Sequence, residues 1–504
     1  MNKARYLLTA FLLFACGLFS IAAAQDLPGK RDSINSGILN EKRIIQVVLP
    51  KKYKPGAAEK YDVLYVLDGE GNTQTAADIQ RFVENEGFMP PTIIVGILNT
   101  DRNRDFLPTH NMESPSSGGA DRFLSFIKDE LIPYIDKTYP TDGDNTIFGH
   151  SYGGVLVTYA LLNEPALFKS YIAADPSYWW DKGVMCKQVK DRLPALANIN
   201  ATLYITGREG SEFVGMGIPP MDTILRNLAP KGLKWKITAY PDETHGSVRL
   251  KSIYDGLKFS YAGFNAKGAE FHPMGGIVLK GKPFKVWCFS DTARLRYTVD
   301  GTEPTASSPK MQSALTLNGP AKFQLKIFTG RMRYNKIATG DFTEGNYLQA
   351  AKKPGNLKPG GFNYSYYEGQ WDKLPDFKSL KPVKTGIADS AFSMDKLPRQ
   401  NNFALVLEGK LEVKEEGYYV FGLGSDDGSK MYLNNQLIMD DDGLHSSDVQ
   451  KSYILPLTQG FYPVRIEYFQ KDGGRDLKVV YLTPSTINTM KIATFPFNLQ
   501  YGKR

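Results

Sequence analysis

Cysteine is scarce in this chain, which has only Cys16, Cys186 and Cys288 among its 504 residues. Cys16 lies in an apolar N-terminal segment, and the other two are far apart in the sequence. This leaves neither a disulfide framework nor a multi-cysteine zinc site. We therefore expect packing, rather than covalent or metal cross-links, to stabilise the fold.

An excess of one charge and long apolar runs are also lacking. The chain carries 61 Lys and Arg against 53 Asp and Glu, a formal net charge of +8, which is too dilute to predict nucleic acid as a partner. After the first 24 residues, no segment offers the roughly 20 consecutive apolar residues that cross a bilayer. We therefore expect no transmembrane segment.

The N-terminal residues follow the order of a secretory signal. Lys3 and Arg5 precede an apolar run over residues 6–21, and three alanines follow at 22–24. This order predicts a signal peptide over residues 1–24 and an exported protein, either periplasmic or secreted. The alternative is a lipoprotein with its lipid on Cys16, but Phe14 is bulky where a small residue is preferred, so cleavage after the alanines is favoured.

Residues 25–264 are expected to form one α/β domain. Short apolar runs alternate with amphipathic helical patterns, which predicts a parallel sheet covered by helices. The expected strands are 44–49, 63–67, 93–97, 146–148, 170–174, 201–206 and 234–240. Between them, six apolar and aromatic residues recur at helical spacing, which indicates a core-facing stripe: Phe123, Phe126, Ile127, Leu131, Tyr134 and Ile135.

After residue 264 the helical pattern stops, and short β-like runs alternate with Gly, Pro, Asn and Asp. Such a pattern predicts β-sandwich domains. We place one over residues 266–345 and a second over 358–504, joined by a linker rich in Lys, Pro and Gly at 352–361. The predicted architecture is therefore an α/β domain followed by two all-β sandwiches.

The segment 145–154, Asn-Thr-Ile-Phe-Gly-His-Ser-Tyr-Gly-Gly, contains the pattern GxSxG. It follows an expected strand and precedes the helical run 155–162, which is the context of a nucleophile elbow in an α/β-hydrolase. Gly149 and Gly153 are expected to leave room around the sharply turned Ser151. Ser151 is therefore the candidate nucleophile.

Only five histidines can serve as its general base, and a serine hydroxyl needs an imidazole near neutral pH. His272 and His445 lie in the β-rich half, and the side chain of His150, inside the elbow, is expected to point away from the nucleophile. In α/β-hydrolases the base comes last in the chain. This favours His245, which follows the last expected strand, over His110 in an earlier loop.

The acid that orients the base is less clear from the sequence. It usually follows the strand expected at 201–206, where Glu209 and Glu212 are available, and Glu209 is preferred. Asp175, after the preceding strand, and Asp242, near the base, are alternatives. A Ser-His dyad without an acid is a further alternative.

An oxyanion hole needs two convergent N–H donors. The residue after the nucleophile, Tyr152, is expected to supply one, and Gly69 or Glu70, after the strand 63–67, the other. This chemistry is acyl transfer and requires no metal or organic cofactor in the catalytic site.

These residues resemble the esterase family that includes enterobactin-type trilactone esterases, S-formylglutathione hydrolase and the feruloyl and acetylxylan esterases of carbohydrate esterase family one. The resemblance covers about residues 43–264 and rests on segments 65–69, 99–105 with Pro108, 149–154, 175–180 and 245–247. It implies the α/β-hydrolase fold. By position, it also implies a substrate cleft lined by Arg102, Arg104, Tyr178, Trp179 and Trp180.

One departure from the family concerns Asp175, where relatives more often have a small hydroxyl residue. The departure keeps Asp175 open as an alternative acid.

The two β units resemble modules found in carbohydrate-active proteins. Residues 297–305, Tyr-Thr-Val-Asp-Gly-Thr-Glu-Pro-Thr, resemble the immunoglobulin-like domain at the C-termini of chitobiases and hexosaminidases, which we interpret as a rigid spacer. The last unit resembles the PA-14-type β-sandwich, through segments 366–371, 417–421, 425–429, 432–435 and 460–469. In sugar-binding members, adjacent aspartates help to hold calcium and a glycan, so the resemblance implies both ligands for Asp426 and Asp427. A tight turn explains the same pair without a ligand.

Together these features predict an exported serine carboxylic-ester hydrolase. The two carbohydrate-associated modules favour an esterified polysaccharide or oligosaccharide as substrate, with removal of feruloyl or acetyl groups. One alternative is hydrolysis of a siderophore trilactone. An alternative of another class is a glycan-binding protein whose hydrolase domain is inert.

Overall fold

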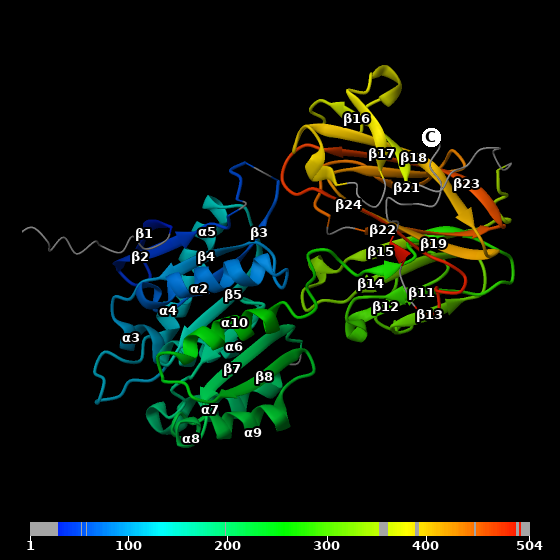
Figure 1. Cartoon of the computed structure of the whole chain (residues 1–504). Helices are drawn as coiled ribbons and strands as arrows, with labels where there is room; N and C mark the ends of the chain where they lie inside the picture. Colours follow the sequence, from blue (N-terminus) through cyan, green and yellow to red (C-terminus); the bar gives the residue numbers. More distant parts are fainter. Residues whose placement is uncertain are drawn as a thin grey trace, which may run out of the picture. The chain divides into compact units, whose positions relative to one another are not determined.

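The computed structural model describes residues 29–51, 53–56, 58–196, 198–351, 361–388, 393–447, 450–489 and 493–494. It divides into two compact units, Met1–Ala266 and Lys267–Arg504 (Figure 1). The expected signal peptide lies outside the described residues. Within the described ranges, no helix has both the length and the apolar character that crossing a membrane requires.

The first unit is built on an eight-stranded sheet in the order β1-β2-β4-β3-β5-β6-β7-β8. The strands are β1 (Lys30–Ser36), β2 (Glu41–Val48), β3 (Tyr61–Val66), β4 (Thr92–Ile97), β5 (Thr141–His150), β6 (Ser170–Ala174), β7 (Ala201–Arg208) and β8 (Leu233–Tyr240). The pairs β1–β2 and β2–β4 are antiparallel, and the remaining neighbours are parallel. All seven expected strands are present. The sequence did not predict β1, because Lys-Arg-Asp-Ser-Ile-Asn-Ser contains no apolar run.

Helices cover both faces of this sheet (Figure 1). On one face, α2 (Gly69–Asn85) packs against α10 (Val248–Ser260). On the other, α6 (Tyr152–Asn163) contacts β5 and β6, and also contacts α3 (Arg102–Phe106), α4 (Ala120–Phe126) and α7 (Trp180–Arg192). The remaining helical elements are the π-helical turn η1 (Ile127–Leu131), α5 (Ile132–Thr138), η2 (Leu193–Ala195), α8 (Ser211–Gly215) and α9 (Ile218–Leu228).

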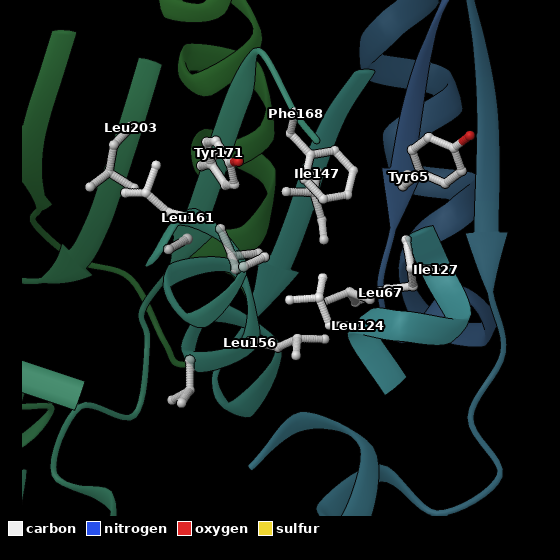
Figure 2. Packing of buried hydrophobic residues seen from close by; sticks show 14 of the residues in the cluster. Tyr65, Leu67, Leu124, Ile127, Ile147, Leu156, Leu161, Phe168, Tyr171 and Leu203 are labelled. Atoms are coloured by element: carbon white, nitrogen blue, oxygen red, sulfur yellow. The ribbon is translucent and has the colours of Figure 1, made fainter. Parts of the chain in front are cut away.

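Alternate residues of the central strands separate the two faces of the sheet. Tyr65, Leu67 and Ile147 belong to the buried cluster under α4 and α6 (Figure 2). On the opposite face, α10 approaches so closely that a Cβ on Gly256 would lie 2.7 Å from the Ile172 side chain. Five members of the predicted stripe are buried in the first cluster, which confirms their core role: Phe123, Phe126, Ile127, Leu131 and Ile135.

The second unit consists of β-strands and short 3-10 turns. Its strands are β9 (Phe271–His272), β10 (Gly275–Val278), β11 (Phe284–Cys288), β12 (Leu295–Thr298), β13 (Ala314–Leu317), β14 (Ala321–Ile327), β15 (Ile337–Glu344), β16 (Phe362–Glu368), β17 (Lys384–Ala388), β18 (Phe403–Val413), β19 (Gly417–Asp426), β20 (Ser429–Leu433), β21 (Gln436–Asp441), β22 (Gln450–Leu457), β23 (Gly460–Gln470), β24 (Asp476–Leu482) and β25 (Ala493–Thr494). The turns are η3 (Thr292–Arg294), η4 (Met332–Tyr334), η5 (Phe377–Ser379) and η6 (Met394–Lys396). These strands form the β-sandwich architecture that the sequence predicts.

The two sandwiches of this unit share one sheet. The shared sheet runs β12-β14-β15-β10-β22-β19-β24-β25, and is packed by a three-stranded sheet, β13-β11-β9, and a six-stranded sheet, β17-β16-β18-β23-β20-β21. The join is β10, which pairs in parallel with β15 and, through Gly276, with Ile454 of β22. A Cβ on Gly276 would lie 2.1 Å from the Ile454 carbonyl oxygen, so this position needs glycine. The sequence pattern predicted two sandwiches but not this continuous sheet.

Candidate active site

Ser151 lies at the sharp turn between β5 and α6. Its φ of 60° and ψ of −117° are unfavourable for a residue with a side chain, and such conformations persist where the surrounding structure enforces them. Here the Ser151 N–H donates to the Ala174 carbonyl at 3.0 Å, and the Gly154 N–H donates to the Ser151 carbonyl at 3.0 Å. The turn has the geometry of a nucleophile elbow.

Two glycines permit this turn. A Cβ on Gly149 would lie 2.3 Å from the Gly153 carbonyl oxygen, and one on Gly154 would lie 2.8 Å from Pro176. Outside its own helix, a Cβ on Gly153 would approach no closer than 3.5 Å, an ordinary contact with Asp68. The tight pair is therefore Gly149 and Gly154, rather than the expected Gly149 and Gly153.

His245 lies between β8 and α10, in the loop where the sequence places the base. Its Nδ1 atom is 2.7 Å from Oδ2 of Asp175. Asp175 is fully buried directly after β6, whereas 42% of the His245 side chain is exposed. An imidazole held through Nδ1 by a buried carboxylate presents Nε2 to the reacting groups, as in a Ser-His-Asp triad.

This contact corrects the preferred acid. The Glu209 side chain is exposed, and its backbone N–H donates to the Tyr240 carbonyl at 3.1 Å. Glu212 pairs with Arg208 at 2.6 Å, and Asp242 is exposed in the turn before the base. The structure brings Asp175, one of the alternatives, to His245, because β6 lies between β5 and β7 and its end is next to both.

Asp175 Oδ2 accepts a second hydrogen bond, from Arg208 Nε at 2.6 Å. Burial alone would raise the pKa of the Asp175 carboxyl, but the hydrogen bonds from His245 and Arg208 outweigh it and lower this pKa below its ordinary value. Asp175 is therefore held as a carboxylate. Arg208 was not predicted from the sequence, because its role depends on the neighbouring strand.

Two further contacts near the nucleophile were not predicted from the sequence. The Ser151 hydroxyl lies 3.1 Å from the hydroxyl of Ser177, which is 2% exposed, and the Ser177 N–H donates to the Ser151 carbonyl at 3.2 Å. Nε2 of His150 lies 2.6 Å from the backbone oxygen of His245, with the two rings 4.3 Å apart. Ser177 thus holds the nucleophile hydroxyl, and His150 braces the loop of the base.

The expected oxyanion donors lie at two helix N-termini. Tyr152 is the first residue of α6, and Gly69 and Glu70 are the first two of α2. The first N–H groups of a helix have no intrahelical acceptor and are available to an anion. A Cβ on Gly69 would lie 2.9 Å from the β4 backbone at Gly96 and Ile97, so the start of α2 packs directly on the sheet. The donor role of these three residues remains a prediction.

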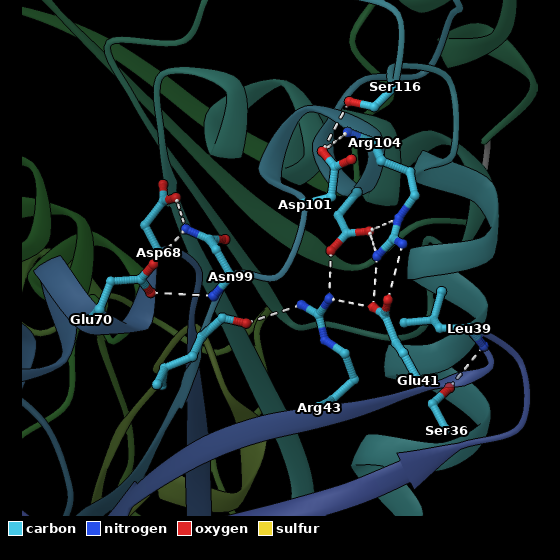
Figure 3. Close-up of polar contacts among 12 residues, drawn as sticks. Ser36, Leu39, Glu41, Arg43, Asp68, Glu70, Asn99, Asp101, Arg104 and Ser116 are labelled. Atoms are coloured by element: carbon cyan, nitrogen blue, oxygen red, sulfur yellow. Dashed lines mark hydrogen bonds and ion pairs between the residues drawn. The ribbon is translucent and has the colours of Figure 1, made fainter.

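The start of α2 is fixed by a polar cluster, of which Figure 3 shows Asp68, Glu70 and Asn99. Asp68 caps the helix with a left-handed backbone, and its carboxylate accepts from Arg102 at 2.6 and 3.0 Å and from Asn99 at 2.8 Å. The Arg102 guanidinium also lies 5.3 Å from the centre of the Tyr152 ring, which favours a cation–π contact. Arg102 therefore connects the two helix starts, with 31% of its side chain exposed.

Arg104 lies in a second cluster, seen beside the first in Figure 3. Its guanidinium binds Glu41 at 2.6 Å and Asp105 at 2.8 Å, and both carboxylates also bind the fully buried Arg43. The side chain of Arg104 is thus engaged in holding α3 to β2. This position corrects the expectation that Arg104 lines the substrate cleft.

The two tryptophans after β6 differ from one another. Trp180 is 3% exposed and donates from Nε1 to Thr109 Oγ1 at 3.2 Å, so it is a packing residue rather than a cleft surface. Tyr178 is also buried, and its hydroxyl lies 2.7 Å from that of Thr158. Trp179 is 47% exposed, with its ring 6.0 Å from Tyr152. Of the three, Trp179 has the position expected of a substrate contact.

In the second unit, Asp426 and Asp427 follow one another across a cis peptide at the end of β19. Asp427 is 6% exposed and accepts from the Lys471 N–H at 2.8 Å. Burial and the neighbouring Asp427 raise the pKa of Asp426. No group of three or more His, Cys, Asp or Glu side chains placed to hold a metal occurs among the described residues. Oxygen ligands suit calcium, and the calcium role of this pair remains a proposal.

Three regions of the chain match known families. Residues 36–202 match the family described as "Putative esterase", residues 273–339 the chitobiase/beta-hexosaminidase C-terminal domain, and residues 357–493 the PA14 domain. The N-terminal region therefore matches the model of this esterase family, and the matches to the other two domains follow it in the chain. The esterase match contains Ser151 and Asp175, and His245 follows it.

The chain is also similar to individual esterases over part of their length. It is 36% identical over 171 residues to the ferri-bacillibactin esterase BesA of Bacillus subtilis (strain 168), covering 30% of this chain and 59% of that protein. It is 40% identical over 145 residues to a siderophore enterobactin esterase of Emericella nidulans, covering 24% and 47%. Among solved structures, an IroE-like serine hydrolase from Shewanella oneidensis is 33% identical, with a TM-score of 0.42, over 45% of this chain and 78% of that one. The chain spans only about half to three fifths of the length of these two curated relatives.

Proposed function

We propose that this protein is a serine carboxylesterase that works through an acyl-enzyme. The observation that carries this proposal is the 2.7 Å contact between His245 Nδ1 and Asp175 Oδ2, beside a serine held in a nucleophile elbow. In a Ser-His-Asp triad, this contact sets the tautomer of the base and stabilises the imidazolium that forms.

In the proposed reaction, Ser151 gives its proton to His245 and attacks the ester carbonyl. The Tyr152 N–H and an N–H of Gly69 or Glu70 stabilise the oxyanion of the tetrahedral intermediate. His245 then protonates the leaving alcohol, and a water molecule hydrolyses the acyl-enzyme by the same route. Because the Ser151 hydroxyl is hydrogen bonded to Ser177 in this structure, it turns toward His245 before it attacks. No step uses a metal or an organic cofactor.

For the substrate, we favour a siderophore ester. The curated relatives described above hydrolyse siderophores by name, at 36% and 40% identity over the matched residues. The exposed Trp179 beside Tyr152 offers an aromatic surface, which suits an aromatic acyl group through stacking. A feruloyl ester also carries an aromatic acyl group, whereas an acetyl ester does not.

The second candidate is an esterified polysaccharide, which the sequence alone favoured. Its support comes from the chitobiase-type and PA14 domains that follow the esterase region. We propose that these domains bind carbohydrate, with Asp426 and Asp427 as calcium ligands. We further propose that the protein is exported, as residues 1–24 predict.

The test is hydrolysis of a panel of esters by the wild type and Ser151→Ala. The panel contains p-nitrophenyl acetate, methyl ferulate, acetylated xylan and a siderophore trilactone. We expect the wild type to hydrolyse at least one ester and Ser151→Ala to lose about a millionfold in kcat, by analogy with a serine protease. The preferred ester then identifies the substrate class.

Two results would contradict the proposal. Equal rates for the two proteins on every ester would remove Ser151 from the mechanism. Glycan binding without turnover of any ester would favour the glycan-binding protein with an inert hydrolase domain.

A further inference from the structure

The end of β7 carries a cation where many α/β-hydrolases have their acid. Arg208 is the last residue of β7, and only 13% of its side chain is exposed. β6 and β7 are parallel neighbours with Ala174 paired to Thr206, so Asp175 and Arg208 leave adjacent strands at the same edge of the sheet. Arg208 is in direct contact with the carboxylate that holds the base.

The Asp175 carboxylate uses one oxygen for both of its side-chain partners. Oδ2 accepts from His245 Nδ1 at 2.7 Å and from Arg208 Nε at 2.6 Å, whereas Oδ1 is buried and has no hydrogen-bond partner among the described residues. The orientation of the carboxylate therefore depends on these two donors. Because His245 is half exposed and Arg208 is nearly buried, Arg208 is the more firmly held of the two.

A second carboxylate holds Arg208 in this position. Arg208 Nη1 donates to Glu212 Oε2 at 2.6 Å, and Glu212 is 59% exposed on α8. The result is a chain of four charged or ionisable groups: His245, Asp175, Arg208 and Glu212. The chain begins at the base, His245, and its outer end is the solvent-exposed Glu212.

We infer that Arg208 is a positioning residue for the catalytic acid, fixing the Asp175 carboxylate against His245 and offsetting the negative charge that the imidazole meets. This inference rests on the proposed esterase function. It adds a fourth residue to the Ser151, His245 and Asp175 set, acting through Asp175 and not on the substrate.

The inference predicts how the charge of Arg208 affects the imidazolium form of His245. His245 is contacted by His150 of β5 and Asp175 after β6. Arg208 of β7 and Glu212 of α8 follow through Asp175, and the charges of Arg249 of α10 and Asp68 before α2 act on His150. Asp175 favours the imidazolium, and the cation of Arg208 opposes it. Removing that cation should favour the imidazolium, so the acidic limb of kcat/KM is expected to move to higher pH.

The direct test is an NMR titration of His245 in the full-length protein labelled with ¹³C at the histidine rings. The chain has only five histidines, and His245→Gln identifies the signal. In Arg208→Gln we expect the midpoint to rise by about one pH unit. Arg208→Lys, which keeps the charge, should restore at least half of the difference.

Two further variants separate charge from structure. Glu212→Gln removes the anion at the outer end, so the His245 midpoint should fall by a few tenths of a pH unit, roughly what a partly screened surface charge produces. The matched control is Arg226→Gln, which breaks a similar pair with Asp222 on the exposed face of α9, 2.8 Å apart, and should leave the midpoint unchanged.

The proposal is overturned if Arg208→Gln titrates as the wild type does, or if Arg208→Lys shifts as far as Arg208→Gln. Should Arg208→Gln not fold, the Glu212→Gln shift decides, since that side chain is exposed and an unchanged or raised midpoint contradicts the inference. The titration needs no turnover. Failure of the esterase proposal therefore appears separately, as equal rates for the wild type and Ser151→Ala.

Discussion

The two units each contain a buried aspartate site, and these sites differ in how their charge is balanced. Asp175 in the first unit is contacted by His245 and Arg208, and its pKa is lowered. Asp426 in the second unit lies against Asp427, and burial together with that neighbour raises its pKa. The first site is balanced by the chain's own cationic groups, which suits a carboxylate that orients a base. The second keeps an excess of negative charge, which suits a cation taken from solution.

The largest effect should come from exchanging a carboxylate for an amide at each site. Asp175→Asn should lower kcat/KM for ester hydrolysis by about 10³- to 10⁴-fold, because an amide favours the wrong imidazole tautomer. Asp426→Asn is the matched change in the other unit and should leave kcat/KM within about twofold. Steady-state kinetics on the preferred ester measure both.

The comparison between the two aspartate sites would fail if Glu209→Gln lowered kcat/KM more than Asp175→Asn does. That outcome would return the acid to β7, where the sequence pattern first placed it.

A smaller effect concerns acid stability, for which the histidines of the two units should act in opposite directions. Burial and the nearby His245 lower the pKa of His150 from 6.5 to about 4. Between these two pH values the unfolded chain binds the proton more readily, so this group costs stability as the pH falls, by at most about 3 kcal/mol. His150→Gln should therefore lose less free energy of unfolding between pH 7 and pH 4.5 than the wild type.

In the second unit, hydrogen bonds to the Asp441 and Ser446 carbonyls outweigh burial and raise the pKa of His445. This group stabilises the folded state below its ordinary pKa of 6.5, and that stabilisation is lost as the pH rises through the folded value. His445→Gln should thus lose stability at pH 4.5 but not at pH 8. Urea unfolding at these pH values measures the free energy of unfolding of both variants. If acid pH changed that free energy in the same direction in both, relative to the wild type, the two units would not differ in this way.

The smallest expected effect is calcium binding at the second site. If Asp426 and Asp427 hold the ion, calcium at about 100 times its Kd should stabilise the unit by about 2.7 kcal/mol. For a domain of this size, that raises Tm by several degrees. Differential scanning calorimetry with CaCl2 or with a chelator should show the increase in the wild type and not in Asp427→Asn. An unchanged Tm in the wild type would leave the pair as a tight turn.

The sequence alone was sufficient for features that depend on neighbouring residues. Seven of the eight strands of the described α/β sheet follow from runs of apolar residues, and the buried stripe from Phe123 onward follows from helical spacing. Ser151 was predicted because its glycines and flanking elements are contiguous, and His245 because it is the histidine of the α/β domain that follows the last strand. Local periodicity and short motifs carry this information.

Only the tertiary structure decided which side chains meet His245. Asp175 is 70 residues away from it in the sequence, and the contact arises because β5, β6 and β7 are adjacent in the sheet. The same adjacency brings Arg208 to Asp175 and Ser177 to Ser151, and pairing between distant strands joins Gly276 to Ile454. In the sequence alone, Asp175 and Arg208 are indistinguishable from ordinary loop charges, and Ser177 and Gly276 from ordinary small residues. The order in which strands pair, set by packing over the whole unit, gives each one its role.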